Sequence, residues 1–503
     1  MRASAAVKTM MRIAGFSVCT MLAGAAVAQP AVPSPATPPQ AEAAQQPTTK
    51  LEVKPLGAVP VVITNVTVIT MTDAGTLPKR TVVVRDGKIA EITDKPVSLK
   101  GSTEVDGSGK FLIPGLCDMH VHFPPFAGDQ GDPSWRAAAL LLANGVTTAR
   151  GMIGHDAHIE LRRRMATGEL VGPLCYFAGP PMNAQAHKTA DKAREAVAAQ
   201  KARGFDLIKS HRVIVPQVYE AIQNTAREQR IAVAGHVDNE VGLDRALAAT
   251  MQIEHMDGLL AAICPPGAEH GWAQMPAPHV KDAADLTQVP AVVARIKKAG
   301  VTVTPTAALF DLIADVNTTN ETLLKKPGIK YIMPNAVKQW EQQRQHTVDN
   351  GPFSDGELGP WFTRVRAAFV AELNKQGVPL MAGSDSPQFF LVTGFALHEE
   401  LEALVRAGLS PAQALKAATA TPADYLRSLP NKGSGAGIDP DFGVIAAGKR
   451  ADLVLLSADP TNDIANTRKI EAVCVRGKWL DRAALDDLLK QIEASVAPKK
   501  PQE

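Results

Sequence analysis

Short apolar runs rich in β-branched residues alternate with polar turns near both ends of the chain. Residues 61–92 contain two such runs, VVITNVTVITM and TVVVRDGKIAEI, and the second has a turn at Asp86-Gly87 that is typical of a β-hairpin. The same pattern returns in FGVIAAGKRADLVLLS and AVCVRGKWL near the C-terminus. We therefore expect residues 56–111 and 435–485 to meet and form one small composite β-sandwich.

The middle of the chain, residues 112–434, alternates strand-like apolar runs with helical stretches, as parallel βα units do. The candidate strands are LIPGLCDMHVH, VTTARGM, LCYFAG, DLIKSH, IAVAGHV, QIEHM, VTVTPT and PLMAGSDS. A TIM barrel has eight parallel strands. The sequence therefore predicts an α/β fold in which a (β/α)8 barrel is inserted between the two halves of the sandwich.

Several helices are indicated between and after these runs. The tetrapeptide SPAQ at 410–413 combines an N-cap Ser, a Pro at the first helical position and a capping-box Gln, and TP at 421–422 repeats the cap and the Pro. A helix is also expected over 394–407. The connections 259–290 and 307–360 are unusually long. Because the active sites of this fold lie among the loops after the strands, we expect these two connections to wall a substrate pocket.

The length and composition are those of a large globular protein. The 503 residues suffice for one large catalytic domain and a smaller accessory domain. The chain is 45% hydrophobic and 21% charged, and no uncharged apolar stretch of about 20 residues follows the N-terminal region. We therefore expect no integral membrane span in the mature chain.

The first 28 residues have the layout of a secretory signal peptide. Three basic residues precede an apolar run at 13–25, and AVA at 26–28 is a small-x-small cleavage pattern. An uncleaved anchor is the alternative, but the run is shorter than the roughly 20 residues that a span needs. Removal of residues 1–28 shifts the formal charge from +2 to −1, which indicates no nucleic-acid partner. The mature protein is expected to be periplasmic or secreted.

The two ends of the mature chain are expected to carry little structure. Residues 29–55 are rich in Pro, Ala and Gln and predict a disordered linker, and residues 486–503 are expected to form a C-terminal tail. The cysteines outside the signal peptide show no framework spacing, so an oxidising compartment permits disulfides without the sequence demanding them; they are Cys117, Cys175, Cys264 and Cys474.

Metal-ligating side chains recur where the candidate strands end. His120 and His122 are two residues apart at the end of the first strand, so both imidazoles face the same side. A lone histidine or lysine at a strand end is more often structural or solvated. Parallel strands of a barrel, however, direct all of these side chains into one mouth. The sequence therefore predicts a metal site made of His120, His122, Lys209, His236, His255 and Asp385.

These residues in their motifs, HVH, DLIKSH, AGHV, IEHM and AGSDS, resemble the amidohydrolase superfamily, nearest its imidazolonepropionase-like and prolidase-like branch. The resemblance continues into AGKRADLVLLSADP and VRGKWL near the C-terminus. It implies that Lys209 is carbamylated and bridges two divalent ions, with zinc as the expected metal. It also implies one ion on His120, His122 and Asp385, and the other on His236 and His255.

Such a site generates a nucleophile at neutral pH. Neutral imidazole and carboxylate suit zinc, and a bound water falls from a pKa of 15.7 to about 7. Asp385 is then expected to be both a ligand and the proton shuttle to the leaving nitrogen. His187 and His211 are further candidates for contacts with the substrate, with surface positions as the alternative.

The resemblance implies hydrolysis of an amide or peptide-like C–N bond in a small molecule, such as an N-acyl amino acid, a dipeptide or a cyclic amide. The segment HRVIVP after Lys209 replaces the Gly-rich stretch of the prolidase-like branch, which counts against dipeptidase specificity. Deamination or ring opening of a heterocycle, and lactone or ester hydrolysis, are alternatives on the same site. An exported metal-binding scaffold is the non-enzyme alternative, and a homo-oligomer stays open.

Overall fold

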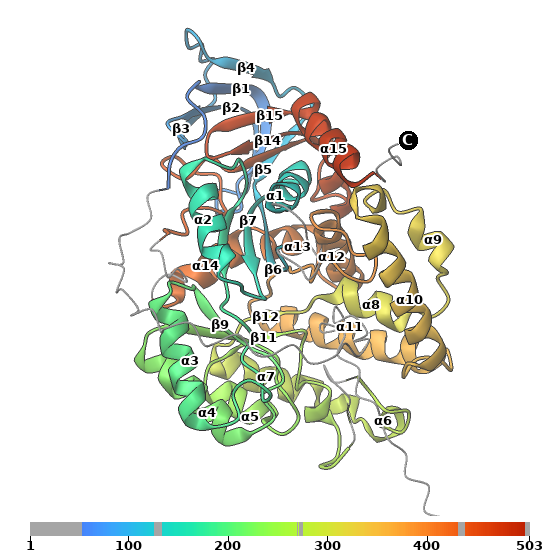
Figure 1. Ribbon diagram of the computed structural model, residues 1–503. Coiled ribbons are helices and arrows are strands. Elements are labelled where there is room, and N and C mark those ends of the chain that lie inside the picture. The colour runs from blue at the N-terminus through green and yellow to red at the C-terminus, as the bar shows by residue number, and fades with distance from the viewer. Residues whose placement is uncertain (1–52, 125–132, 269, 271–274, 431–437, 498–503) are drawn as a thin grey trace, which may run out of the picture.

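The structure is a computed structural model that describes residues 53–124, 133–268, 270, 275–430 and 438–497 (Figure 1). The expected signal peptide, 1–28, and all but the last three residues of the expected linker, 29–55, lie outside the described residues. Among the described helices, none combines the length and the apolar character that crossing a membrane requires.

Segments from both ends of the chain form one β-rich domain, as the sequence predicts. Its eight strands are hydrogen-bonded in the order β15-β14-β13-β5-β1-β2-β3, with β4 paired to β1. The N-terminal part contributes β1 (Val61–Ile69), β2 (Thr76–Arg85), β3 (Lys88–Thr93), β4 (Thr103–Asp106) and β5 (Phe111–Pro114). The C-terminal part contributes β13 (Leu453–Leu456), β14 (Ile470–Val475) and β15 (Lys478–Asp481). The antiparallel pair β5 and β13 joins the two parts.

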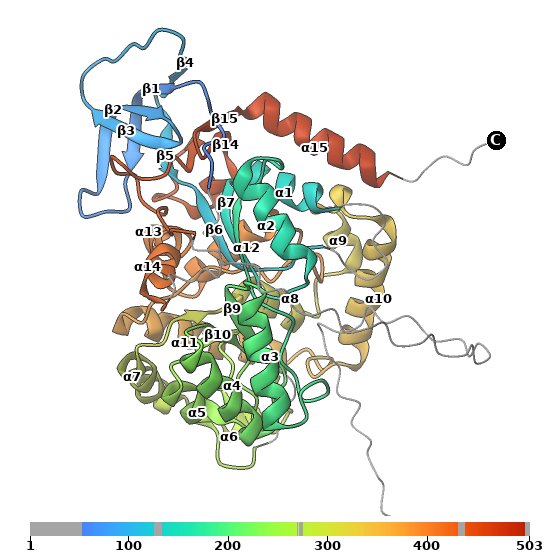
Figure 2. The ribbon, with the colours of Figure 1, turned by 60° about the vertical axis from the view of Figure 1, so that its left-hand side comes forward.

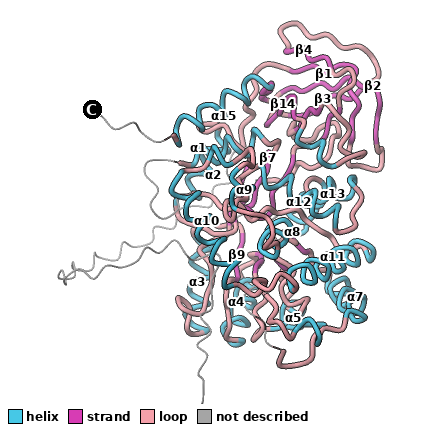
Figure 3. Tube along the Cα trace, turned by 90° about the vertical axis from the view of Figure 1, so that its right-hand side faces the viewer, coloured by secondary structure: helices cyan, strands magenta, loops and turns pink. Residues whose placement is uncertain are grey.

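The predicted hairpin turn between β2 and β3 is present. Asp86 and Gly87 have φ angles of 52° and 74°, the left-handed pair that a two-residue hairpin of matching twist requires. The sheet buries one hydrophobic core of its own, which includes Val82, Leu112 and Leu453. Figure 3 shows these strands gathered at one end of the molecule.

Parallel strands form the barrel in two groups. The first contains β6 (Leu116–Val121), β7 (Val146–Gly151) and β8 (Leu174–Phe177). The second contains β9 (Leu207–Ser210), β10 (Ala232–Gly235), β11 (Gln252–Glu254) and β12 (Val303–Thr304). A parallel bridge between Ala178 and Leu207 links the groups. The first seven candidate strands are therefore confirmed, each with shorter bounds than its apolar run.

The eighth candidate strand, 379–386, pairs with its neighbours through isolated β-bridges. Parallel bridges connect Leu380 to Val303 and Ser386 to Val121, so the segment lies between β12 and β6 and completes the ring. It approaches its neighbours very closely at Gly383, where a Cβ would lie 2.7 Å from that of His120. Only glycine fits there, and the segment forms single bridges instead of a regular strand.

Helices surround the barrel strands, and the largest hydrophobic core lies between the two layers. They are α1 (Ser134–Ala143), α2 (Ala157–Thr167), α3 (Ala190–Ala202), α4 (Pro216–Glu228), α5 (Gly242–Ala248), α7 (Val289–Ala299), α11 (Leu358–Gln376), α12 (Phe395–Arg406), α13 (Pro411–Ala417) and α14 (Ala420–Ser428). The capping box at Ser410 and the helix expected over 394–407 are confirmed. The predicted cap at Thr421 is wrong, because α14 already begins at Ala420, after Thr419.

The two long connections hold structure of their own. The first contains η1 (Ala261–Ile263), α6 (Val280–Ala283) and η3 (Leu286–Gln288). The second is mostly helical, with α8 (Ala307–Ala314), α9 (Asn320–Leu324), η4 (Ile329–Tyr331) and α10 (Pro334–Asn350) before α11. A short helix, η5 (Ile464–Arg468), lies between β13 and β14.

The segment expected as a C-terminal tail is helical as far as Val496. Helix α15 (Arg482–Val496) begins at the side-chain cap of Asp481 and runs beside α1 (Figure 2). Its residues Leu485 and Ile492 are fully buried. The apolar residues are therefore spaced so that one face of the helix packs against the protein, although the segment as a whole is polar in composition. The cysteines at 117, 175, 264 and 474 are all free thiols.

Candidate metal centre

The six predicted ligands all lie at the carboxyl ends of barrel strands and are buried. His120 lies near the end of β6, Lys209 lies within β9, and His236 and His255 directly follow β10 and β11. His122 follows β6 and Asp385 lies in the eighth segment. Their exposed fractions range from 1% to 8%. The rule that parallel strands converge at one mouth thus locates all six, while their role as ligands stays a prediction.

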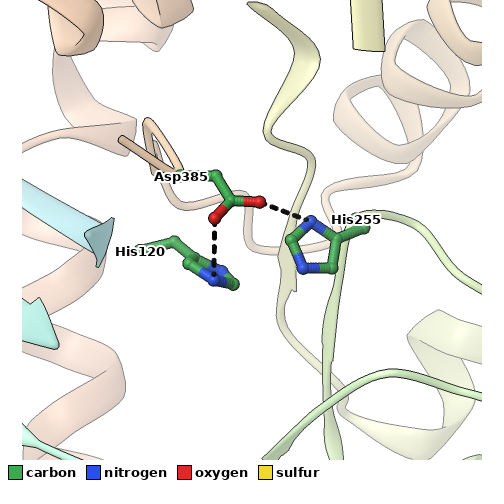
Figure 4. A group of neighbouring side chains, drawn as sticks. All are labelled: His120, His255 and Asp385. Carbon is green, nitrogen blue, oxygen red and sulfur yellow. Dashed lines mark ion pairs between the residues drawn. The ribbon is translucent and has the colours of Figure 1, made fainter. Parts of the chain in front are cut away.

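Asp385 is the meeting point of three of the imidazoles. Its Oδ1 lies 2.7 Å from His122 Nε2 and 3.5 Å from His120 Nε2. Its Oδ2 lies 3.6 Å from His255 Nδ1. Figure 4 shows the carboxylate between His120 and His255, each facing one of its oxygens. Potential ligand atoms of His120, His255 and Asp385 lie within 4.8 Å of one another, close enough to share one ion.

His236 extends this group on the far side of His255. Their rings stack with centroids 4.5 Å apart, and the His120 and His255 centroids are 4.7 Å apart. Burial lowers the pKa of all three histidines well below the usual value, and the positive charge of Lys209 acts in the same direction. Neutral imidazoles are the form that binds metal ions, so this environment suits the task.

Each of these three histidines has an acceptor on its Nδ1 atom. His120 Nδ1 lies 2.7 Å from Glu254 Oε2, and His236 Nδ1 lies 2.7 Å from Asp257 Oδ2. A histidine bound to a metal usually donates its other ring N–H to such a carboxylate, which fixes the tautomer and orients the ring. With Nδ1 protonated, Nε2 keeps its lone pair for an ion.

The third histidine uses a hydroxyl instead of a carboxylate. His255 Nδ1 lies 2.8 Å from Thr306 Oγ1, and that hydroxyl donates to the Pro305 carbonyl at 2.8 Å. Because the hydroxyl has a single proton, it accepts from His255 Nδ1–H. The Nε2 atom of His255 is therefore also the one left for a metal.

Two buried carboxylates support the histidines and were not among the predicted site residues. Arg150 pairs with Glu254 at 2.6 Å, while burial raises the pKa of Glu254. Burial likewise raises the pKa of Asp257 to about 7. In QIEHMD, Glu254 directly precedes His255 and Asp257 follows it by two residues, and an acidic residue inside a buried strand is the signal that could have found Glu254.

Asp118 ties the first strand to the eighth segment. Its Oδ2 accepts from Ser384 Oγ at 2.6 Å, and its Oδ1 accepts from Ser384 N at 3.0 Å and from His120 N at 3.2 Å. One carboxylate thereby fixes the backbone beside His120 and beside Asp385. Burial raises the pKa of Asp118 to about 7.

The backbone around the site adopts conformations that most residues avoid. His255 and Asp385 have φ angles of 62° and 53°, in the left-handed region. A residue held there costs roughly 1–3 kcal/mol, and such residues gather at functional sites. Gly235, just before His236, has no room for a side chain, since a Cβ would lie 2.1 Å from Ser210 O.

The two residues predicted to contact substrate differ in their surroundings. His211 is 6% exposed, and its ring meets that of His236 edge-on at 5.0 Å, so it borders the site. Burial lowers its pKa to about 2. His187 lies in the loop after β8, where its Nδ1 accepts from Asn183 N at 3.2 Å. It folds onto its own loop, and a contact with substrate stays a prediction for both.

The donor set fits divalent ions. It offers four imidazoles, a carboxylate and a buried lysine. On three of the imidazoles, the Nδ1 atom has a hydrogen-bond partner. His122 also has a buried Nδ1 without a hydrogen-bond partner among the described residues. Imidazole and carboxylate are ligands for zinc and similar ions.

Residues 111–480 match the model of the amidohydrolase family, and the chain belongs to this family. The fold is that of bottromycin amidohydrolase, with 24% identity, a TM-score of 0.65, and coverage of 87% of this chain and 90% of the other. A Xaa-Pro dipeptidase with bound methionine in its active site has 18% identity, a TM-score of 0.60, and coverage of 84% and 100%. The predicted superfamily and fold class are confirmed.

Matches among curated proteins are local. A dihydroorotase from Bacillus cytotoxicus is 32% identical over 115 residues, which are 22% of this chain and 27% of that protein. The chain thus aligns with less than a third of the length of this relative. The family contains hydrolases that act on C–N bonds, so the predicted class of enzyme is confirmed at the level of the family.

Proposed function

We propose that this protein is a binuclear metal-dependent hydrolase that cleaves an amide or peptide-like C–N bond of a small substrate. The substrate is an N-acyl amino acid, a dipeptide or a cyclic amide. The observation that carries the proposal is the convergence of His120, His122 and His255 on Asp385, with His236 stacked on His255. The amidohydrolase and the dipeptidase among the structural neighbours support the type of bond.

The residues divide between two ions, with zinc as the expected metal. One ion is held by His120, His122 and Asp385, and the other by His236 and His255. When bound, the ions lower the pKa of water to about 7 and polarise the scissile carbonyl.

Lys209 joins the two groups of ligands as a carbamate. The ammonium first loses a proton, and the neutral amine then adds to the carbon of carbon dioxide and loses a second proton, so a cation becomes an anion. The Lys209 side chain is 1% exposed, and its positive charge lowers the pKa of the three imidazoles of His120, His236 and His255. A carbamate at this position reverses the sign of the charge and favours divalent cations.

Asp385 moves the proton in the reaction. Its Oδ atoms are already directed at His120, His122 and His255, so the carboxylate lies where the attacking water is held. Asp385 accepts the proton from that water and transfers it to the leaving nitrogen as the C–N bond breaks. The leaving group departs as a neutral amine, and the acyl part is released as a carboxylic acid.

A substrate panel tests the type of bond. Zinc-loaded protein is incubated with N-acyl amino acids, dipeptides, cyclic amides, aminoheterocycles, lactones and esters, and release of amine, ammonia and acid is measured separately. Amine with acid, or ring opening of a cyclic amide, supports the proposal. Ammonia from heterocycles, or hydrolysis of lactones and esters alone, favours the alternatives on the same site. Bound metal without any turnover favours the scaffold.

We further propose that the chain is exported, with cleavage after Ala28. The proposal rests on the basic, apolar and small-x-small order of the first 28 residues.

A further inference from the structure

Arg366 reaches from α11 to the carboxyl ends of two neighbouring barrel strands. Its Nη1 donates to the carbonyl of His255 at 2.9 Å, and its Nη2 donates to the carbonyl of Pro305 at 2.8 Å. His255 follows β11, and Pro305 follows β12. One side chain from α11, the helix that follows the second long connection, thereby joins two strand ends, one of which carries a predicted metal ligand.

The surroundings of the guanidinium are apolar. Arg366 is 8% exposed, and its guanidinium carbon lies 3.9 Å from the ring centroid of Phe310 and 5.5 Å from that of Phe362. Within the part of the chain that the structure describes, no carboxylate lies at ion-pair distance from Arg366. Two carbonyl dipoles and two ring faces contact the guanidinium directly, which suits the planar fork of arginine, and the carboxylates of Asp257, Asp311 and Glu400 act on its charge from a longer distance.

The two carbonyls belong to backbone that is held away from its usual conformations. His255 has a φ angle of 62°, and Thr306, which follows Pro305, has a φ angle of 47°. Neither residue is a glycine, so both need outside support to remain left-handed. The Arg366 fork provides hydrogen bonds to both stretches at once.

These same two residues meet again through their side chains. His255 Nδ1 donates to Thr306 Oγ1, at 2.8 Å. The imidazole direction of His255 therefore depends on the relative position of the two strand ends, which Arg366 sets through the backbone.

We propose that Arg366 is a positioning residue of the metal site, which holds His255 and Thr306 so that the His255 imidazole points at the ion. This inference rests on the proposed function, since it concerns the site that the metal fills. It predicts that the fork affects metal affinity in the resting protein, before any substrate binds.

The test compares Arg366→Met with a matched control, Arg344→Met. Arg344 on α10 is also buried and donates to backbone carbonyls, those of Leu312 and Thr318, both at 2.8 Å, but it touches no strand end of the barrel. Zinc affinity of each metal-free chain, without residues 1–28, is measured by competition with a chromophoric chelator. We expect Arg366→Met to lower zinc affinity by about 10–100-fold, as loss of support for a ligand does. Arg344→Met should keep the parent's affinity.

A conservative variant covers the case in which Arg366→Met fails to fold. Arg366→Lys keeps the charge but replaces the two-pronged fork with one ammonium, so zinc affinity should still fall. Unchanged affinity in a folded Arg366 variant, beside a parent that binds zinc, overturns the inference while leaving the proposed function intact. A parent chain that binds no zinc overturns both.

Discussion

His120 Nδ1 and Glu254 Oε2 lie 2.7 Å apart, at the ends of β6 and β11, two strands that are separated in the ring by β12 and the eighth segment. The other carboxylate oxygen of Glu254 pairs with Arg150 at 2.6 Å, and both of these side chains are fully buried. The side chains of His120, Glu254 and Arg150 thus form one connected network that joins the three strands β6, β11 and β7. The imidazole of His120 is thus oriented by a buried carboxylate of another strand.

Glu254→Gln tests this support. The amide oxygen still accepts a hydrogen bond, but the amide carries no charge to balance that of Arg150. Breaking a buried ion pair in this way lowers the free energy of unfolding by about 3–5 kcal/mol. We expect the free energy of unfolding to fall and zinc affinity to drop by about 10–100-fold, as for loss of a partner that orients a ligand. Chelator competition and chemical denaturation measure the two effects.

Asp206→Asn is the control for Glu254→Gln. Asp206 is a buried carboxylate whose Oδ2 pairs with Arg162 at 2.6 Å and accepts from Phe177 N at 2.6 Å. Its loss should destabilise the fold and leave zinc affinity unchanged. Equal zinc affinity in the two variants would show that Glu254 has only a structural role.

Asp385→Asn should abolish turnover. The amide removes the basic oxygen that takes the proton from water, and the two other carboxylates beside the histidines, Glu254 and Asp257, already face Nδ1 atoms. The measurement is kcat/KM on the best substrate of the panel, with zinc content determined on the same sample. A variant that retains activity within about tenfold of the parent rules out the shuttle role.

Glu400 makes the stability of the fold depend on pH. Its Oε2 accepts from Ala308 N at 2.8 Å, and burial raises the pKa of its carboxyl from 4.5 to about 8. The folded state therefore binds more protons than the unfolded state between these two values, so stability from this group is complete below pH 4.5 and is lost as pH rises to about 8.

Glu400→Gln removes this dependence because glutamine does not ionise. We expect the variant to gain stability relative to the parent as pH rises, with a larger gain in Tm at pH 9 than at pH 5. Thermal unfolding of metal-free protein at both values measures it. A difference in Tm that is the same at both pH values would contradict the raised pKa of Glu400.

Expression of the full chain in a bacterial host with an export system tests the signal peptide. We expect the mature protein to begin at Gln29, directly after the AVA pattern. Intact mass and N-terminal sequencing of the protein from the periplasm and the medium locate the cleavage. A full-length chain retained in the membrane fraction would favour the uncleaved anchor.

Local rules were enough to predict where the six candidate ligands lie. Strand ends of a parallel barrel share one mouth, so the positions of His120, His236 and Asp385 followed from where apolar runs stop. The capping box at Ser410 followed from hydrogen bonds between near neighbours in the chain. In these cases the decisive contacts are close in sequence or are imposed by the topology of the fold.

The supporting residues could not be predicted in the same way. Arg366 and Thr306 both contact His255, and these contacts depend on how the segments after β12 pack against the strand ends. No spacing in the sequence predicts that packing. The eighth segment resembles a strand in composition, yet close packing at Gly383 leaves only isolated bridges. Helix α15 was missed because its buried residues meet α1, which is more than 300 residues away in the sequence.

The most direct test of the account is metal content measured by elemental mass spectrometry on the chain without residues 1–28, beside Lys209→Ala. A binuclear centre bridged by Lys209 predicts about two zinc-like ions per parent chain. It also predicts loss of metal and activity in Lys209→Ala, with partial rescue of activity by added short carboxylic acids. One ion that is insensitive to Lys209, or full metal content in the variant, would contradict a binuclear centre bridged by this lysine.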